Sequence, residues 1–478
     1  MAVKAEIAAR YIDDKTDLII GVSDHLWNLS ELALREFESA DYLAQELESE
    51  GFEVERDVGG LPTAFVASWG SGGPIIGFLA EYDALAGMSQ KPIPKREPLV
   101  TGAPGQACGH NLLGAGAFGA AIALKAQMEE EGIQGTVRLY GCPAEENLSG
   151  KAFMARAGAF DDCDVCLTWH PGTLNRVRTG SSLANNAMNL VFSGQSAHAA
   201  GDPYNGRSAL DAIQLMNMGV EFLREHMPPR ARVHYVITEG GSQPNVVPDR
   251  AKVWYLVRAP ERHEVDELYE RVLNCAGGAA QMTDTEFEIE LLKAIWNVLP
   301  NRPLEELLEG CMQRIGPPGF DDEDREFASQ IISTLPEGRV ESYLKAQNLT
   351  DEEVEFLKDK QLNDTVLPRP QEPDEPKGST DVGDVSWCAP TAQFSTACLA
   401  LATPGHSWQY VAQSGMDIGR KGMLLAARIM AEAGYELLTD AEWIDRARED
   451  FERRTGGRSY RSAMPADHQP AFDQFAEA

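Results

Sequence analysis

Apolar positions in the first third of the chain alternate between helical and strand spacing, which predicts a mixed α/β fold. Leucine and phenylalanine recur at helical spacing across residues 24–50, and Gly51 ends that pattern. Short apolar runs bounded by glycine clusters predict four strands, at residues 64–69, 74–80, 136–142 and 165–169. Residues 109–131 predict a long helix between the second and third strands.

The pattern changes near residue 186 and predicts an inserted unit. Its expected order is a strand at 188–192, a helix at 208–226, strands at 233–237 and 252–258, a helix at 265–282 and a strand at 287–292. This βαββαβ order is typical of a ferredoxin-like α+β domain. We therefore expect a catalytic domain in two parts, residues 1–185 and 299–478, interrupted by an inserted domain at 186–298.

The last third is less regular. Helices return at Arg302, but residues 316–377 are acidic, proline-rich and poorly patterned, and their end reads as an extended loop. Residues 392–401 rebuild α/β structure, and a helix is expected from Met416 to Ala433 with Gly434 as its stop signal. From about Gly456 the sequence predicts a frayed tail.

Composition narrows the class of protein. The 478 residues carry 74 acidic and 42 basic side chains, a net charge of −32, and no basic patch offsets it. Such a surface disfavours nucleic acids and anionic membranes as partners. The longest apolar stretch, 112–124, is too short to cross a bilayer, and no N-terminal signal is evident.

The eight cysteines lack the spacing of a disulfide framework, so a reduced, cytoplasmic protein is expected. Cys163 and Cys166 have the spacing of a redox motif but overlap a predicted strand. Strand alternation would place their side chains on opposite faces, so we interpret both as structural.

Candidate chemistry gathers in three short stretches. They are Cys108-Gly-His110, Pro143-Ala-Glu145-Glu146 and Thr168-Trp-His170-Pro, and His406 follows far downstream. Thiolate, imidazole and carboxylate are ligands that zinc, manganese or cobalt accept. Neighbouring carboxylates do not easily reach one ion, so one glutamate is expected to bind metal and the other to handle a proton. Spacing alone leaves open whether His406 is a ligand or a loop residue.

Position along the predicted strands supports a shared site. Asp83, Glu145 and His170 each follow or end a predicted strand, and open α/β sheets gather their sites at the carboxyl ends of strands. No Gly-x-Ser-x-Gly elbow, Walker motif or dinucleotide fingerprint is present. The residues therefore favour metal-assisted hydrolysis.

Assembled, these stretches resemble the metallopeptidases of the aminoacylase and carboxypeptidase G type, in particular the p-aminobenzoyl-glutamate-utilising group of their amidohydrolase branch. The resemblance spans nearly the whole chain. It rests on Glu81-Tyr-Asp-Ala-Leu, Cys108-Gly-His-Asn-Leu-Leu-Gly, Gly141-Cys-Pro-Ala-Glu-Glu, Leu167-Thr-Trp-His-Pro, Ser196-Ala-His-Ala-Ala, Pro244-Asn-Val-Val-Pro, Gly378-Ser-Thr-Asp-Val-Gly-Asp and Thr403-Pro-Gly-His-Ser.

The resemblance implies a phosphorylase/hydrolase-like catalytic domain that binds two divalent metal ions, Zn or Mn, and a lid that forms a homodimer contact. The implied metal ligands are Cys108, which would bridge the ions, His110, Glu146, His170 and His406. The other implied roles are Glu145 as general base, Asp83 as a carboxylate near the ligands, His198 as a lid histidine reaching a neighbouring subunit's site, Asn245 as holding the substrate carboxylate, and Arg302 as a second clamp for it.

The implied reaction is hydrolysis of an N-acyl amino acid, with p-aminobenzoyl-glutamate as the expected substrate. Indole-acetyl amino acids, β-alanyl dipeptides and acetylated small molecules are alternatives, as is a role as partner subunit of a mixed amidohydrolase. The chain departs from the family pattern at Asn111 and Leu113, where related amidohydrolases often carry Asp and His. The 316–377 insertion also exceeds the compact family pattern.

Overall fold

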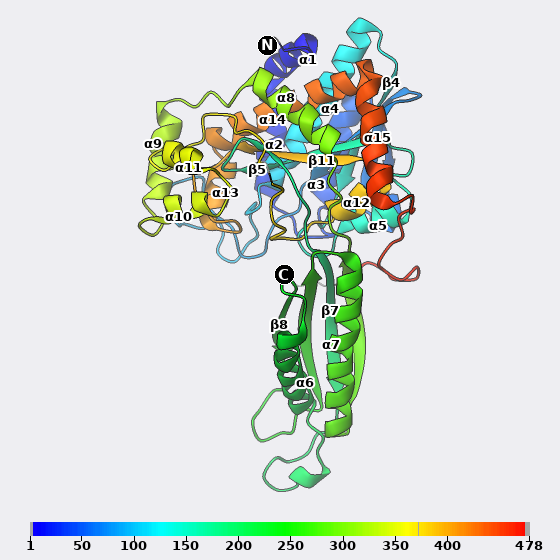
Figure 1. Ribbon diagram of the computed structural model, residues 1–478. Helices are drawn as coiled ribbons and strands as arrows, with labels where there is room; N and C mark the ends of the chain where they lie inside the picture. The colour runs from blue at the N-terminus through cyan, green and yellow to red at the C-terminus, as the bar shows by residue number, and fades with distance from the viewer. Residues whose placement is uncertain (1–2, 371, 474–478) are drawn as a thin grey trace.

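Two β-sheets organise the chain in a computed structural model that describes residues 3–370 and 372–473 (Figure 1). The larger sheet has the order β1-β2-β4-β3-β5-β11-β6. Its strands are β1 (Glu53–Arg56), β2 (Phe65–Ser71), β3 (Ile75–Glu81), β4 (Gly135–Cys142), β5 (Val165–Gly172), β6 (Arg176–Arg178) and β11 (Thr391–Ala397). β3, β4, β5 and β11 run parallel to their neighbours in this set, while β1, β2 and β6 are antiparallel. The predicted α/β class is confirmed.

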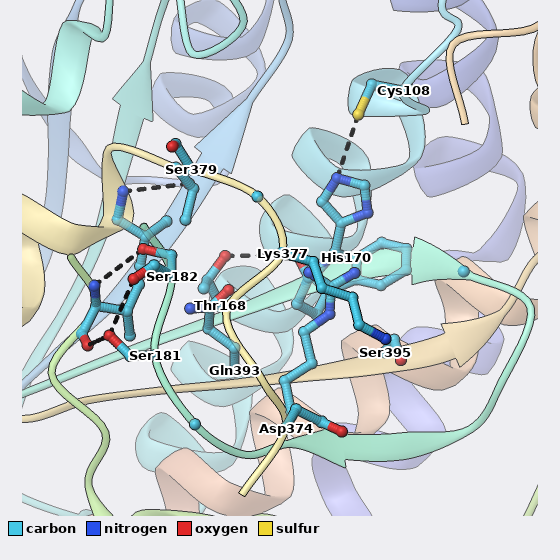
Figure 2. A pocket seen from close by; sticks show the side chains of 18 of the residues that line it. Cys108, Thr168, His170, Ser181, Ser182, Asp374, Lys377, Ser379, Gln393 and Ser395 are labelled. Atoms are coloured by element: carbon cyan, nitrogen blue, oxygen red, sulfur yellow. Dashed lines mark hydrogen bonds between the residues drawn. The ribbon is translucent and has the colours of Figure 1, made fainter. Parts of the chain in front are cut away.

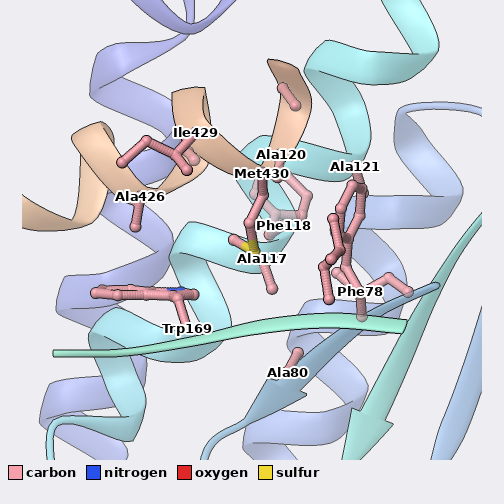
Figure 3. Close-up of a cluster of buried hydrophobic side chains, with 14 of the residues drawn as sticks. Phe78, Ala80, Ala117, Phe118, Ala120, Ala121, Trp169, Ala426, Ile429 and Met430 are labelled. Atoms are coloured by element: carbon pink, nitrogen blue, oxygen red, sulfur yellow. The ribbon is translucent and has the colours of Figure 1, made fainter. Parts of the chain in front are cut away.

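Helix α4 (His110–Glu131) forms the centre of the main core. It is rich in alanine and glycine, so it packs closely against both the sheet and α14 (Asp417–Thr439). Figure 3 shows Ala117 and Phe118 of α4 between Phe78 and Trp169 of the sheet and Met430 of α14.

Helix α14 does not stop at Gly434 but continues to Thr439. A Cβ at position 434 would lie 2.4 Å from Leu124 Cδ2. Gly434 therefore serves close packing between α14 and α4, and the predicted stop signal is wrong.

The helical pattern across residues 24–50 divides into two helices. α2 (Thr16–Leu29) follows α1 (Glu6–Asp14), and α3 (Phe37–Ser49) begins after a seven-residue break. Ser30 and Leu34 adopt the left-handed conformation there, with φ of 46° and 59°. The break buries Glu36, which accepts hydrogen bonds from Thr63 Oγ1 (3.1 Å) and the Ala144 amide (2.8 Å). Periodicity alone could not reveal this interruption, because both helices bury their leucines on the same core.

The second sheet, in the order β10-β7-β9-β8, forms an elongated unit that extends away from the larger sheet (Figure 1). We call residues 184–295 the lid. Its elements are β7 (Ala184–Ser193), α6 (Ala209–Leu223), β8 (Arg232–Glu239), β9 (Arg250–Ala259), α7 (Arg262–Thr283) and β10 (Glu286–Ile295). Both helices pack on one sheet face around a core that includes Ile213, Tyr255 and Leu268. The expected βαββαβ order is present.

The remaining helices surround the large sheet. They are α5 (Gly150–Arg156), α8 (Arg302–Ile315), α9 (Asp322–Ile332), α10 (Arg339–Lys345), α11 (Asp351–Leu357), α12 (Val382–Cys388), α13 (Trp408–Ser414) and α15 (Ala441–Thr455). Residues 316–377, which we call the insertion, thus contain three short helices rather than unpatterned chain. Capping boxes at Asp321 and Thr350 start two of these helices.

The C-terminal segment is packed rather than frayed as far as residue 473. Arg156 Nη1 donates to the carbonyls of Pro465 and His468 at 2.9 Å, and the Tyr460 hydroxyl lies 2.6 Å from Asp384 Oδ1. The expectation of a frayed tail from Gly456 is therefore wrong for the part described. Within residues 3–370 and 372–473, none of the helices combines the length and the apolar character needed to span a membrane.

Candidate metal centre

Three neighbouring strands and one helix bring the candidate ligands to a single edge of the large sheet. β3, β4 and β5 lie side by side and parallel, so their carboxyl ends meet. Glu145 and Glu146 follow β4, His170 lies near the end of β5, and His110 is the first residue of α4.

The ligand atoms form two triads that share one sulfur. The atoms of Cys108, His110 and His170 lie within 4.8 Å of one another, and so do those of Cys108, Glu146 and His406. Cys108 Sγ is 3.4 Å from His170 Nε2 (Figure 2), and His406 Nε2 is 3.4 Å from Glu146 Oε2. This arrangement offers two adjacent ion positions with the thiolate between them.

Two buried atoms indicate that the residues fit a metal pair. His110 Nε2 and Glu146 Oε1 make no hydrogen bond in the described part of the chain, although neither reaches solvent, and His110 Nε2 faces the carboxylate of Glu81 at 3.1 Å. Buried polar atoms are normally satisfied, so these two are free to coordinate a cation. A thiolate, three imidazoles and a carboxylate form a donor set suited to zinc or manganese.

The pKa values of the ligands also favour a cation at this site. Burial raises the pKa of Glu146 to about 8, and the negative charges of Glu145 and Asp83 add to the effect. Burial likewise raises the pKa of the Cys108 thiol, helped by Glu146. Burial and then the charge of Arg178 hold the pKa of His170 well below its usual range, which keeps it in the neutral form that binds metals. A bound cation would compensate the crowded negative groups.

Asp83 orients His110. Its Oδ1 lies 2.9 Å from His110 Nδ1, and its Oδ2 accepts a hydrogen bond from the Glu146 amide at 3.0 Å. A carboxylate on the far nitrogen of a ligand histidine fixes the ring and its tautomer. Asp83 therefore connects the ligand segments of α4 and β4.

Sequence reasoning missed Glu81, which ends β3. Its Oε2 is 3.1 Å from His110 Nε2, and the ligand atoms of Glu81, His110 and Glu145 lie within 4.8 Å of one another. Burial, followed by the charge of Glu81, raises the pKa of Glu145. The position of Glu81 at a strand end, like that of Glu145, was the signal that could have identified it.

A fully buried ion pair lies behind Glu81. Lys151 Nζ is 2.6 Å from Glu81 Oε1 and 2.7 Å from Asp381 Oδ1, and all three side chains are buried. Lys151 belongs to α5, and Asp381 immediately precedes α12. No local pattern marks Lys151, because its partner Asp381 is 230 residues away in the chain.

The two departures from the family pattern do not touch the ligands. Asn111 Nδ2 donates to Ser23 Oγ and to the Ser414 carbonyl, both at 3.0 Å. The backbone carbonyl of Leu113 accepts from Trp169 Nε1 at 3.1 Å. Both residues therefore support helix packing.

His198 and Asn245 lie together in the exposed loops at the far end of the lid. The Ala199 amide donates to the Asn245 carbonyl at 3.1 Å, and the Gly201 amide donates to His198 Nδ1 at 3.0 Å. The ten residues of β7 separate this end from the large sheet, a distance of roughly 33 Å for an extended strand. Within one chain the two residues therefore do not join the ligands.

The structure does not bring Arg302 to the ligands. It begins α8, its Nε lies 3.8 Å from Glu305 Oε2, and its amide donates to Asp450 Oδ2. Among the residues described, those that line the cavity beside the ligands do not include it. α8 packs on α14, α15, β6 and β11, so within one chain Arg302 does not join the ligands, and its role as a substrate clamp stays a prediction.

A cavity of about 540 Å³ opens beside Cys108, Glu145, Glu146, His170 and His406 (Figure 2). Its wall combines cations with hydroxyl and amide groups that the sequence did not identify. These are Arg176, Arg178, Arg258, Lys293, Lys377, Thr179, Ser181, Ser182, Ser379, Asn185 and Gln393.

Two other cysteine-containing clusters do not form comparable sites. Cys311 lies near Glu432 and Glu436, but Arg314 pairs with both glutamates and Lys4 pairs with Glu436 as well. Cys163 Sγ and Cys166 Sγ are both buried and lie 3.5 Å apart. Cys163 precedes β5, so strand alternation does not separate the two side chains. The predicted placement of these two side chains on opposite faces of a strand is therefore wrong.

Comparisons with known proteins agree with this geometry. Residues 185–280 match the peptidase dimerisation domain of the M20 group. The chain is 44% identical over 473 residues to one of the subunits of the p-aminobenzoyl-glutamate hydrolase of Escherichia coli, covering 97% of this chain and 98% of that protein. The chain belongs to the M20 family of metal-dependent peptidases and amidohydrolases.

Other M20 proteins are more distant. A mouse Xaa-Arg dipeptidase is 28% identical, covering 93% of this chain and 91% of that one. A dinuclear metal-binding M20 peptidase from Bacillus subtilis superposes with a TM-score of 0.57 at 18% identity, covering 90% and 99% of the two chains. An aminobenzoyl-glutamate utilization protein from Klebsiella pneumoniae superposes with a TM-score of 0.56 at 19% sequence identity, covering 87% of this chain and 97% of that one. These two structures share the fold.

Proposed function

We propose that this M20 protein hydrolyses the amide bond of p-aminobenzoyl-glutamate and releases p-aminobenzoate and glutamate. The observation that carries the proposal is the convergence of Cys108, His110, Glu146, His170 and His406 beside a second carboxylate, Glu145. The choice of substrate rests on the 44% identity, over almost the whole chain, to a protein named for hydrolysis of that compound.

Cys108, His110 and His170 would hold one divalent ion, and Cys108, Glu146 and His406 the other. Divalent ions bound there would polarise the scissile carbonyl and make water a stronger acid at neutral pH. We propose that the two ions are either zinc or manganese.

Glu145 acts as the proton carrier in this proposal. It accepts a proton from the attacking water and delivers it to the nitrogen of the leaving amine. Burial and the neighbouring charge of Glu81 raise the pKa of Glu145, which makes it a stronger base than an exposed glutamate. Asp83 holds His110 through its Nδ1, and Glu81 faces its Nε2.

The charge of the cavity supports an acidic substrate. Arg258 and Lys293 line it without an ion pair to any described carboxylate, in a chain of net charge −32. Arg258 Nε, Asn185 Oδ1 and Ser379 Oγ are buried there and lack hydrogen-bond partners in the described part of the chain. A carboxylate would satisfy the donors among these groups. An arginine leaving group, as in the name of the Xaa-Arg dipeptidases, would be repelled.

We also propose that the protein assembles through the lid. α6 exposes Leu215, Met218 and Phe222, and the edge strand β8 exposes Val236 and Ile237. An unpaired edge strand beside an apolar helix face is a surface suited to a second copy.

Such pairing would allow His198 and Asn245 to act in the neighbouring protomer's site. A homologous protein of the same family is the alternative partner: the other E. coli p-aminobenzoyl-glutamate hydrolase component is 30% identical over half of this chain. The unpaired cysteines fit a cytoplasmic location.

An assay of the purified chain alone tests the proposal. Manganese-loaded and zinc-loaded samples should release p-aminobenzoate from p-aminobenzoyl-glutamate faster than they cleave indole-acetyl-aspartate, a β-alanyl dipeptide or an acetylated amino acid. A preference for any of those three would overturn the substrate assignment. Activity that appears only on adding a homologous partner protein would show that this chain works as one half of a mixed enzyme.

A further inference from the structure

Arg178, like Arg258 and Lys293, lines the cavity without an ion pair to any described residue, but it belongs to the large sheet. It ends β6, its side chain is exposed to the cavity, and it makes no ion pair with any carboxylate in residues 3–370 and 372–473. Its neighbour Arg176 is fixed instead: it pairs with Asp374 at 3.2 Å and donates to the Gln347 carbonyl at 2.7 Å. Two arginines of one short strand therefore have different roles, and Arg178 keeps its hydrogen-bonding capacity free.

The strand register places Arg178 near the ligand cluster. Arg178 pairs with Gln393 of β11, and Gln393 pairs with Thr168 of β5, so the three residues form one row across the sheet. A parallel row two residues along contains Arg176, Ser395 and the ligand His170. Adjacent strands are about 4.8 Å apart, so Arg178 lies roughly 10 Å from the β5 backbone at Thr168, two residues before His170.

Electrostatics agree with that proximity. After burial, the charge of Arg178 is the next largest influence that lowers the pKa of His170. The adjacent Thr179 Oγ1 is buried, lines the cavity and has no hydrogen-bond partner in the part of the chain described. A cation and an unsatisfied hydroxyl on consecutive residues form a place where an anionic ligand group gains charge-assisted hydrogen bonds.

The insertion closes the wall behind Arg178. The Tyr343 hydroxyl of α10 lies 2.8 Å from Thr173 Oγ1, and Lys377 Nζ donates to the Ala346 carbonyl at 2.6 Å. Asp374 pairs in parallel with Gly180. The Tyr343 and Asp374 contacts attach the insertion to the chain around β6, and the Lys377 contact joins two parts of the insertion, which together form one wall of the cavity.

The cavity thus carries cations on two separate sheets. Arg258 and Asn185 are cross-strand partners in the lid, whereas Arg178 belongs to the large sheet. A substrate with a single carboxylate would satisfy only one of these groups. A substrate with two carboxylates would satisfy both.

We propose that Arg178 binds the side-chain carboxylate of the amino acid being released, so that the enzyme selects acyl derivatives of acidic amino acids. This inference rests on the proposed function and specifies its substrate class. The carboxylate of a glutamate side chain would replace the missing ion pair of Arg178, and the uncharged amide of glutamine would not.

The test compares p-aminobenzoyl-glutamate with p-aminobenzoyl-glutamine, which lacks only the second charge. Wild-type protein should favour the glutamate compound in kcat/KM. Arg178→Gln should lower kcat/KM on that compound by roughly 10- to 100-fold, mostly through KM, and leave the glutamine compound almost unchanged. Arg178→Lys should restore part of the selectivity. Equal losses on both compounds, or no loss, would overturn the assignment.

A binding experiment separates this inference from the proposed function. Glutarate and its monoamide, glutaramate, would be titrated calorimetrically into metal-loaded wild type, Arg178→Gln and the control Arg339→Gln. Arg339 begins α10 in the same insertion, is exposed and does not line the cavity. We expect Arg178→Gln to weaken glutarate alone, even if p-aminobenzoyl-glutamate proves not to be cleaved. Equal glutarate binding by wild type and Arg178→Gln would contradict the proposal.

Discussion

The sulfur of Cys108 lies 3.4 Å from Nε2 of His170, although 62 residues separate them in the chain. Cys108 precedes α4, and His170 is near the end of β5, so the contact joins a helix start to a strand end. The same sulfur belongs to the second triad with Glu146 and His406. A cysteine shared by two triads of candidate ligands is the central feature of this site.

Glu145→Gln should separate proton transfer from metal binding. The change keeps the shape of the side chain and all five proposed ligands, but it removes the base. We expect metal content to stay unchanged while kcat falls by roughly 100-fold or more. Inductively coupled plasma mass spectrometry and steady-state kinetics would measure the two quantities. Glu146→Gln is the matched control and should lose metal; if Glu145→Gln loses it instead, the roles of the pair are reversed.

Lys151→Met should be strongly destabilising. It leaves the buried carboxylates of Glu81 and Asp381 without their cation, and removal of one partner of a buried ion pair typically costs about 3–5 kcal/mol. Urea unfolding of metal-loaded protein would measure the change. Lys345→Met removes an exposed helical pair with Glu341 and should alter stability by no more than about 0.5 kcal/mol. Similar losses for both variants would show that the buried pair has no special role.

Asp384 should make stability depend on pH. Burial raises the pKa of Asp384 to about 7, above the value of about 3.9 expected in the unfolded chain. Between these values the unfolded chain releases a proton that the folded protein retains. The contribution of Asp384 is therefore fully present below about pH 4 and is lost as the pH rises to about 7, by at most about 1.4 kcal/mol per pH unit.

Asp384→Asn provides the measurement of that effect. The amide of the variant stays neutral at every pH. The free energy of unfolding of Asp384→Asn minus that of wild type should therefore rise from pH 4 to pH 7 and then remain level. Wild type and variant are both loaded with metal and compared at the same pH, so any release of metal affects both and cancels in the difference. A difference that does not vary with pH would contradict the raised pKa of Asp384.

Gly422 should resist substitution although it lies within α14. A Cβ there would lie 2.4 Å from the Ala397 carbonyl oxygen, so Gly422→Ala must displace α14 from β11. We expect a loss of about 1–3 kcal/mol, as for other overpacked sites. Gly21 of α2 has no atom within 4 Å of the added Cβ, and Gly21→Ala should gain about 0.5–1 kcal/mol from helix propensity. Thermal unfolding of the two variants would show opposite shifts.

Features encoded in short segments could be predicted from the sequence. The βαββαβ order of the lid, the strand that precedes Glu145 and the strand that contains His170 follow from local apolar patterns, which report burial directly. Features that depend on distant partners could not. Lys151 looks like an ordinary helix residue until Asp381 is placed beside it, and Arg178 is distinguished from Arg176 only by the contacts that Arg176 makes with the insertion.

Anomalous diffraction from metal-loaded crystals tests the central claim most directly. Data collected at the absorption edge of the bound metal should show two peaks, both within coordination distance of Cys108 Sγ. His110 and His170 should complete the contacts of the first peak, and Glu146 and His406 those of the second. A single peak, or peaks that leave Cys108 without a metal, would contradict the account.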